Sequence, residues 1–190
     1  MNEDVLNWFQ NDELFFRECR EGHKWQTYVG EYLKAQGLPV VIAEQTFRGN
    51  PNVSEYTDEE AKRWAAARQK SEMARTEYTN APDLLVCSKV VEVKSRDLKF
   101  TKPDDFPFSQ IFVDTVDGYE RKERKPALYV CVSQITGAMI CALGKKADHW
   151  TKLKVRDSKR QLPVLNYAMS WRYWHPIEWA VRAFTEMRGN

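Results

Sequence analysis

The sequence predicts an α/β fold in which helices flank a mixed β-sheet. Two amphipathic segments, 21–37 and 177–187, repeat apolar residues every three or four positions, which is the spacing of one helix face. Between them lie short apolar runs separated by turn signals, the pattern typical of strands. With 190 residues, 43% of them hydrophobic and 29% charged, the chain can bury a full globular core. We therefore expect a single domain over residues 1–190.

The first half of the sheet comes from three segments. Gly37 is placed to end the first helix, because glycine readily takes the left-handed conformation that closes helices. Residues 39–47 then supply the first strand. The runs 84–86 and 90–93 indicate two adjacent strands, and the polar step 88–89 between them predicts a tight turn.

A helical insertion is expected at 49–80. A capping box at 57–60 begins a stretch of strong helix formers with alternating charge. Its apolar face is narrow, so this helix cannot be buried deeply. Two interpretations are open: an arm over the functional site whose cations reach phosphates, or a solvated helix with internal ion pairs. The cations concerned are Arg63, Arg68, Lys70 and Arg75.

The second half of the chain completes the mixed sheet. Residues 96–109 form a loop punctuated by two prolines, and 110–116 fit either a strand or a helix. Strands are expected at 127–133 and 138–143, with a glycine marking the turn between them. A strand and helix extension is expected over 145–190.

Charged residues on the hairpin are the strongest functional signal. Asp83, Glu92 and Lys94 adjoin apolar runs, where burial normally excludes charge. The hairpin brings Asp83 beside Glu92, and strand alternation turns Glu92 and Lys94 to the same face. We expect these three side chains to meet on one small patch.

Metal-assisted phosphodiester hydrolysis suits such a patch. Two close carboxylates repel each other unless a cation lies between them, and hard oxygen ligands favour Mg²⁺ or Mn²⁺ over zinc. Lys94 would orient the attacking water or stabilise the negative charge that builds on the phosphoryl group. Burial lowers the pKa of a lysine whereas neighbouring anions raise it, so the direction for Lys94 is open from sequence alone.

The string Pro82-Asp83, eight residues, then Glu92-Val93-Lys94 resembles the PD-(D/E)XK nuclease superfamily, and the segment 92–96 resembles the corresponding strand end of archaeal Holliday-junction resolvases. The resemblance covers residues 20–143. It implies a restriction-endonuclease-like three-layer core with a central mixed β-sheet flanked by helices. In this family the two acids bind one or two divalent ions together with the backbone carbonyl between acid and lysine, here that of Val93.

A second match to the same short pattern begins at Pro103-Asp104 and ends at Glu120-Arg121-Lys122. It lies in the polar stretch 118–125, which has no strand pattern to hold it. Only the first match has apolar strands on both halves. We therefore place the site there and interpret the second match as solvated surface.

The helix before the first strand often adds a metal-proximal Glu in relatives, and Gln26 falls at that place here. This chain departs from that Glu, although Gln also occurs there in relatives. A neutral amide would bind an ion more weakly, through water. Glu21 and Glu31 are competing ligand candidates, and both fit solvated helix positions better.

Basic residues define the expected nucleic-acid interface. Residues 145–160 carry seven Lys or Arg against two Asp, whereas 1–21 are acidic, so the whole-chain charge of +2 hides a local excess. Such an excess suits a polyanion, and a solvated basic face is the alternative. The residues assigned to DNA contact are Arg63, Arg68, Arg75, Arg96, Lys145, Lys146, Lys152 and Lys154.

Other classes of function lack a signal. No Gly-rich phosphate loop argues for a nucleotide cofactor, and three scattered histidines form no metal motif. The four cysteines make no CxxC pair and are expected to be free thiols. With no signal peptide or membrane-spanning run, we expect a cytoplasmic protein without membrane contact.

The sequence thus predicts a nuclease that hydrolyses DNA with Mg²⁺ or Mn²⁺, as an endonuclease in recombination, repair or processing. The alternative is a nucleic-acid- or protein-binding module that keeps the fold without turnover. The complete set of Asp83, Glu92 and Lys94 favours the enzyme, whereas Gln26 favours the module. A homodimer is compatible with either hypothesis.

Overall fold

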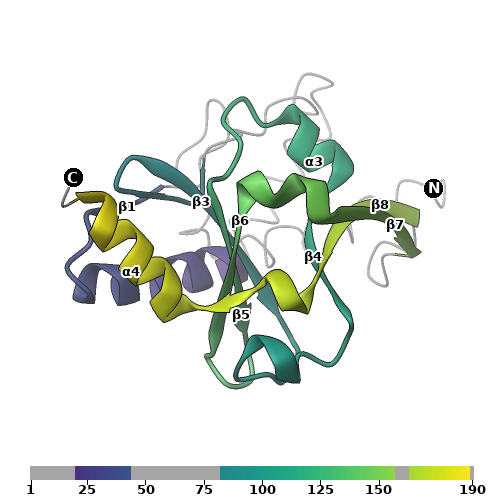
Figure 1. Ribbon diagram of the computed structural model, residues 1–190, viewed down its shortest axis with the longest axis horizontal. Helices are drawn as coiled ribbons and strands as arrows, with labels where there is room; N and C mark the ends of the chain where they lie inside the picture. Colours follow the sequence, from purple (N-terminus) through teal and green to yellow (C-terminus); the bar gives the residue numbers. More distant parts are fainter. Residues whose placement is uncertain (1–19, 44–81, 157–162, 189–190) are drawn as a thin grey trace, which may run out of the picture. The chain divides into compact units, whose positions relative to one another are not determined.

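The computed structural model describes residues 20–43, 82–156 and 163–188. Contacts divide the chain into two compact units, the first made of residues 1–24 and 44–81 and the second of 25–43 and 82–190. The second unit contains all of the described strands (Figure 1). The expected insertion at 49–80 lies outside the described residues.

A six-stranded mixed sheet forms the centre of the second unit, so the predicted α/β class is confirmed. Strands β3 (Lys89–Arg96) and β5 (Leu128–Ser133) run parallel and every other neighbouring pair is antiparallel. The expected strands at 127–133 and 138–143 are present as β5 and β6 (Met139–Leu143). In sheet order the strands are β1 (Val40–Ile42), β2 (Leu84–Val86), β3 (Lys89–Arg96), β5 (Leu128–Ser133), β6 (Met139–Leu143) and β9 (His175–Pro176).

A second sheet has three antiparallel strands in the order β4-β8-β7: β4 (Gln110–Thr115), β8 (Pro163–Ser170) and β7 (Trp150–Arg156). The ambiguous segment 110–116 is therefore mainly a strand. The short helix α3 (Val116–Arg121) follows it directly, because the Thr115 side chain accepts a hydrogen bond from the Gly118 N–H and caps the helix. In the described part of the chain, the connections contain the 3₁₀ turns η3 (Pro103–Asp105), η4 (Gly144–His149) and η5 (Trp171–Tyr173).

The two long helices of the described residues end close to the predicted positions. The first includes residues 20–35 and closes as predicted at Gly37, which has a φ of 79°. There the Leu38 N–H donates to the Leu33 carbonyl and the Gly37 N–H to the Lys34 carbonyl, the paired bonds of a Schellman motif. The last helix is α4 (Ile177–Arg188). None of the described helices is long and apolar enough to cross a membrane.

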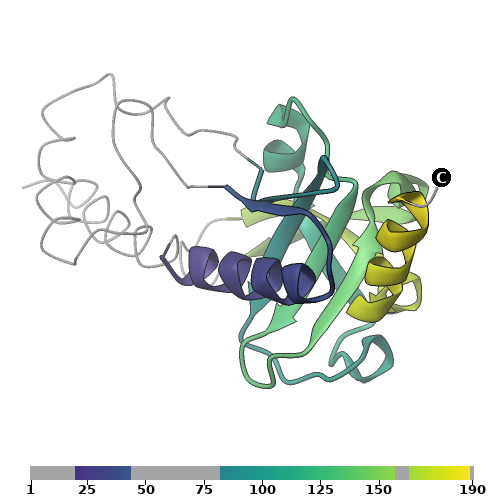
Figure 2. The same ribbon diagram turned by 90° about the vertical axis from the view of Figure 1, so that its left-hand side faces the viewer.

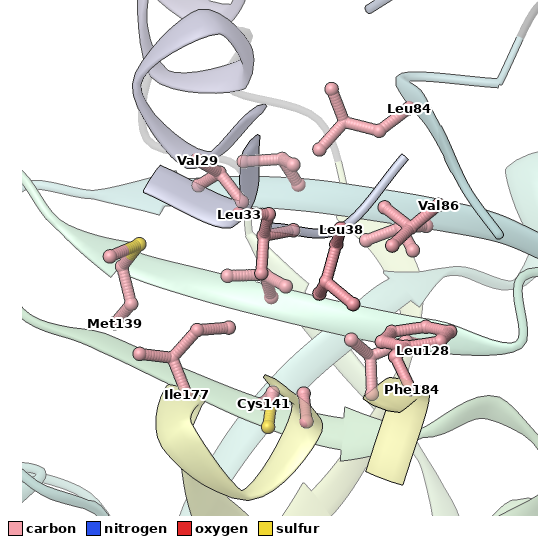
Figure 3. Close-up of a cluster of buried hydrophobic side chains, with 14 of the residues drawn as sticks. Val29, Leu33, Leu38, Leu84, Val86, Leu128, Met139, Cys141, Ile177 and Phe184 are labelled. Atoms are coloured by element: carbon pink, nitrogen blue, oxygen red, sulfur yellow. The ribbon is translucent and has the colours of Figure 1, made fainter. Parts of the chain in front are cut away.

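Both long helices pack on one face of the large sheet (Figures 2 and 3). Val29 and Leu33 from the 20–35 helix belong to the same apolar cluster as Ile177 and Phe184 from α4, together with side chains of β2, β3 and β5. Gly30 lets the first helix approach the sheet closely, because a Cβ there would lie 2.7 Å from an Ile42 side-chain atom. This apolar cluster fixes the helix that carries Gln26.

The opposite face of the large sheet packs against the small sheet. Tyr129, Cys131 and Ile140 from β5 and β6 contact Ile111 and Met169 from β4 and β8 in a second apolar cluster. In the described part of the chain, the layers are therefore helices, large sheet and small sheet. Among these residues, helices cover one face of the large sheet as predicted, and the small sheet supplies the apolar cover for the other face.

Candidate active site

The β2–β3 hairpin sets the geometry of the site. Leu84 pairs with Val91 and Val86 with Lys89, so the turn consists of Cys87 and Ser88, one residue earlier than predicted. Both turn residues have positive φ, 48° and 63°, as in the type I′ turns that match the twist of paired strands. A sequence without glycine or asparagine at these two positions gives no signal for that turn.

Asp83 lies immediately before β2 and is held by two donors. Its Oδ2 accepts a hydrogen bond from the Val93 backbone N–H at 2.7 Å, and its Oδ1 accepts one from Gln26 Nε2 at 2.7 Å. Gln26 is buried, and its Oε1 is a buried acceptor without a hydrogen-bond partner. The structure thus brings Gln26 and Asp83 together, as the resemblance implied.

The environment of Asp83 is short of positive charge. Desolvation, followed by the negative charge of Glu92, raises the pKa of Asp83 to about 8. The ammonium groups of Lys94 and Lys122 and the Val93 N–H act in the opposite direction and do not compensate. A second carboxylate beside Asp83 is the arrangement that a bound cation relieves.

Glu92 and Lys94 point away from the helices. They alternate with Val91 and Val93, which face the helical layer, so their side chains lie on the face covered by the small sheet. Lys94 Nζ lies 2.6 Å from Glu92 Oε1, and the Glu92 side chain is only 8% exposed. The predicted pairing of these residues on one patch is therefore present.

Lys94 is a stable cation in this setting. Burial acts to lower its pKa, but the charges of Glu92, Asp114 and Asp83 outweigh burial and raise it. This settles the direction that the sequence leaves open. A lysine that keeps its proton can stabilise negative charge, and it cannot serve as a general base near neutral pH.

Asp114 is a site residue that the sequence did not reveal. Along β4, Phe112 pairs with Ala168 and Asp114 with Tyr167, so Val113 is skipped and the strand contains a bulge. In regular alternation Asp114 would point away from the face that Val113 occupies. The bulge instead buries both side chains, and Asp114 Oδ1 lies 3.3 Å from Lys94 Nζ.

Lys122 also belongs to the site, which corrects our interpretation of its segment as solvated surface. It follows α3, its side chain is 17% exposed, and its Nζ lies 2.6 Å from Asp114 Oδ2 and 3.2 Å from Glu92 Oε1. Lys94, Glu92, Lys122 and Asp114 therefore form a closed ring of alternating charge. We call these four residues the charge ring.

The two lysines of the charge ring favour the ionised form of Asp114. Desolvation acts to raise the pKa of Asp114, but Lys94 and Lys122 outweigh desolvation and lower it. Tyr129, which pairs with Glu92 across β3 and β5, is buried beside these groups. Burial and the charges of Asp114 and Glu92 raise its pKa, so its hydroxyl stays neutral.

The acids of the second match and the two competing acids of the first helix lie elsewhere. Glu31 forms an exposed ion pair with Lys34 at 2.7 Å and Glu21 one with Lys24 at 3.9 Å, as expected of solvated helix positions. Asp104 of η3 forms an exposed ion pair with Lys102 at 3.0 Å. Glu120 accepts a hydrogen bond from the Tyr167 hydroxyl at 2.7 Å. Of the second match, only Lys122 reaches the site.

The predicted DNA-contacting residues are scattered among the described elements. Arg96 at the end of β3 donates to the Phe112 carbonyl at 3.4 Å. Lys145 is exposed, and Lys152 and Lys154 are exposed on the same face of β7. The side chain of Lys146 and all of Arg63, Arg68 and Arg75 lie outside the described residues. Within the described part, no hydrogen bond or ion pair joins Lys145, Lys152 or Lys154 to the site residues.

The donor set fits a hard divalent cation better than zinc. Among the described residues, no group of three or more His, Cys, Asp or Glu side chains could hold a metal ion. The site offers two carboxylates, of Asp83 and Glu92, and the unpartnered Gln26 Oε1. Mg²⁺ and Mn²⁺ accept such oxygen ligands and keep several waters when only one or two carboxylates bind them.

The chain was compared with family models, curated proteins and solved structures, and nothing in any of the three matches it.

Proposed function

We propose that this protein is a nuclease that hydrolyses DNA phosphodiester bonds with Mg²⁺ or Mn²⁺. The observation that carries the proposal is the environment of the Asp83 carboxyl group. Its carboxyl group is fixed by Gln26 and Val93 beside Glu92, and its pKa is raised to about 8. A half-buried and a buried carboxylate next to a protonated lysine suit a divalent ion and a phosphate.

The carboxylates of Asp83 and Glu92 would hold the ion, with Gln26 Oε1 and the Val93 carbonyl as further oxygen donors. A divalent ion bound there supplies a water of lowered pKa and neutralises charge on the phosphate. Lys94 keeps its proton, so it stabilises the charge that develops on the phosphoryl oxygens or orients the attacking water.

The fold and the surface charge support DNA as the substrate. The parallel pairing of β3 with β5 in an otherwise antiparallel sheet is compatible with a restriction-endonuclease-like core. Exposed Lys152 and Lys154 provide cations for a nucleic-acid backbone. An endonuclease of recombination, repair or processing is the class of activity that we propose.

The test incubates the protein with linear, supercoiled, single-stranded and branched DNA and with duplex RNA, in EDTA, Mg²⁺ or Mn²⁺. We expect metal-dependent cleavage of DNA that Asp83→Asn and Lys94→Met each reduce by at least ~100-fold. Asp117→Asn is the matched control, because Asp117 forms an exposed ion pair with Arg121. Cleavage that survives both site substitutions would show that the activity lies elsewhere.

One observation favours a second candidate, a binding module without turnover. Glu92 Oε1 already lies near two ammonium groups, those of Lys94 and Lys122, so the charge ring neutralises Glu92 without an ion. If every substrate survives in Mg²⁺ and Mn²⁺ while duplex DNA is still bound, the binding module is correct and the enzyme is not.

A further inference from the structure

Lys122 occupies a position that the proposed chemistry does not yet use. Its Nζ lies 3.2 Å from Glu92 Oε1, the same oxygen that Lys94 Nζ approaches to 2.6 Å. Two ammonium groups therefore converge on one carboxylate oxygen from different elements, β3 and the segment after α3. Both lysines also reach Asp114, which holds them side by side.

The position of Lys122 is fixed by backbone structure. Its N–H closes α3 by donating to the Tyr119 carbonyl at 3.2 Å, and α3 itself begins directly after the strand that carries Asp114. Its side chain is 17% exposed to solvent, so an anion arriving from solvent can reach it. A lysine that served only to neutralise buried acids would not need this access.

Counting charges shows what an ion would change. When Asp83 is ionised, the carboxylates of Asp83, Glu92 and Asp114 and the two ammonium groups of Lys94 and Lys122 leave one negative charge in excess. A divalent ion on Asp83 and Glu92 reverses this to one positive charge in excess. A phosphodiester carries one negative charge and balances it. Because the ion takes the place of Lys122 as the partner of Glu92, the Lys122 ammonium group is then available to bind the phosphate.

We propose that Lys122 is a second phosphate-binding lysine of this site and that Asp114 is the residue that positions it. The ligand group is a nonbridging oxygen of the phosphodiester that the site would cleave. This inference rests on the proposed function for its effect on cleavage, whereas its effect on phosphate binding is measurable without turnover.

The test uses Lys122→Met, Lys122→Arg and the control Lys89→Met. Lys89 is exposed at the start of β3, about 17 Å from Lys94 along the strand. In single-turnover cleavage with Mg²⁺, we expect Lys122→Met to lower the maximal rate on the order of 100-fold. Lys122→Arg keeps the charge and retains at least about a tenth of the rate, whereas Lys89→Met cleaves at the full rate.

Binding is measured separately in a Lys94→Met background, where cleavage is suppressed, by the anisotropy of a labelled duplex in Mg²⁺ over a range of salt. We expect Lys122→Met to reduce the slope of log K against log salt by about 0.9, the value for one lost phosphate contact. Lys122→Arg leaves the slope unchanged. An unchanged slope with Lys122→Met would overturn the inference.

The outcomes separate the two proposals. If the native chain cleaves DNA and Lys122→Met cleaves equally fast, this inference fails and the proposed function stands. If the native chain cleaves nothing, the proposed function fails and the salt slope still decides the role of Lys122. Should Lys122→Met not fold, the double variant Lys122→Met/Asp114→Asn avoids an uncompensated buried carboxylate and is expected to show the same losses.

Discussion

Gln26 Nε2 donates a hydrogen bond of 2.7 Å to Asp83 Oδ1 and so joins the 20–35 helix to the start of β2. Together with the Val93 N–H on the other carboxylate oxygen, it fixes Asp83 by two donors. These donors do not offset desolvation and the charge of Glu92, and the pKa of Asp83 is still raised to about 8. The site is therefore ordered around a carboxyl group that is costly to ionise.

The first prediction concerns stability against pH in the absence of divalent ions. The pKa of Asp83 rises from 3.8 to about 8 on folding, so between these values the folded protein binds more protons than the unfolded chain. The free energy of unfolding therefore falls as the pH rises through this window. We expect the protein in EDTA to be more stable at pH 5 than at pH 8 in urea unfolding.

Asp83→Asn should remove most of this decrease in the free energy of unfolding, because an amide does not titrate. Asp117→Asn, which changes an exposed carboxylate, should leave the decrease unchanged. If Asp83→Asn and the native chain show the same pH dependence, the carboxyl group of Asp83 is not the titrating group.

The second prediction concerns divalent ions. Because a proton on Asp83 competes with an ion, we expect Mg²⁺ or Mn²⁺ to stabilise the fold more at pH 8 than at pH 6. At a free ion concentration ten times Kd the gain is about 1.4 kcal/mol. Thermal unfolding with and without the ion measures it.

Glu92→Gln should abolish this gain, whereas Glu31→Gln should not, because Glu31 lies in an exposed pair with Lys34. Equal stabilisation of the native chain and Glu92→Gln would place ion binding at another site.

The third prediction tests the charge ring by a double-mutant cycle. Lys122→Met leaves Asp114 and Glu92 with one neighbouring cation fewer. We expect it to lower the free energy of unfolding by on the order of 2–3 kcal/mol. The loss is smaller than for a fully buried pair because Lys122 keeps some contact with water. Asp114→Asn should cost a similar amount, and the double variant about 1–2 kcal/mol less than the sum of the two.

The exposed pair Asp117–Arg121 provides the comparison. It is spaced as a helix (i, i+4) pair, and its coupling energy should be about 0.5 kcal/mol or less. Chemical denaturation of the two single variants and the double variant at each pair gives both coupling energies. A coupling energy for Lys122 and Asp114 no larger than that of the exposed pair would show that the ring does not stabilise the fold.

The fourth prediction concerns the hairpin turn. Ser88 has a φ of 63°, a conformation that glycine adopts without the steric cost of a Cβ atom. Ser88→Gly should therefore stabilise the protein by about 0.5–1 kcal/mol. Ser88→Ala keeps the Cβ atom and should bring no gain. A loss of stability with Ser88→Gly would mean that the chain entropy of glycine outweighs the relief of strain.

Local patterns were enough to predict the hairpin part of the site. Asp83, Glu92 and Lys94 come together because strand alternation and a short turn act over a dozen residues, and both are visible in the sequence. Gln26 required only the helix period and the family resemblance. The helix end at Gly37 likewise follows from one residue type.

The rest of the site depends on contacts between distant segments. Strand β4 pairs with β8, more than fifty residues away, and no local sequence pattern predicts that pairing. Asp114 escaped prediction because a bulge breaks the alternation on which strand predictions depend. Lys122 escaped because its polar neighbours are typical of surface, although its own amine reaches two buried acids.

The bulge in β4 makes the site depend on strand register as well as residue type. A regular ladder with β8 through Phe112, Val113 and Asp114 would turn Asp114 away from the interior, with every side chain of the charge ring still encoded. A change of register that removed the bulge would therefore disrupt the site as completely as a substitution of Asp114. The local pairing of this strand is part of the functional specification of the chain.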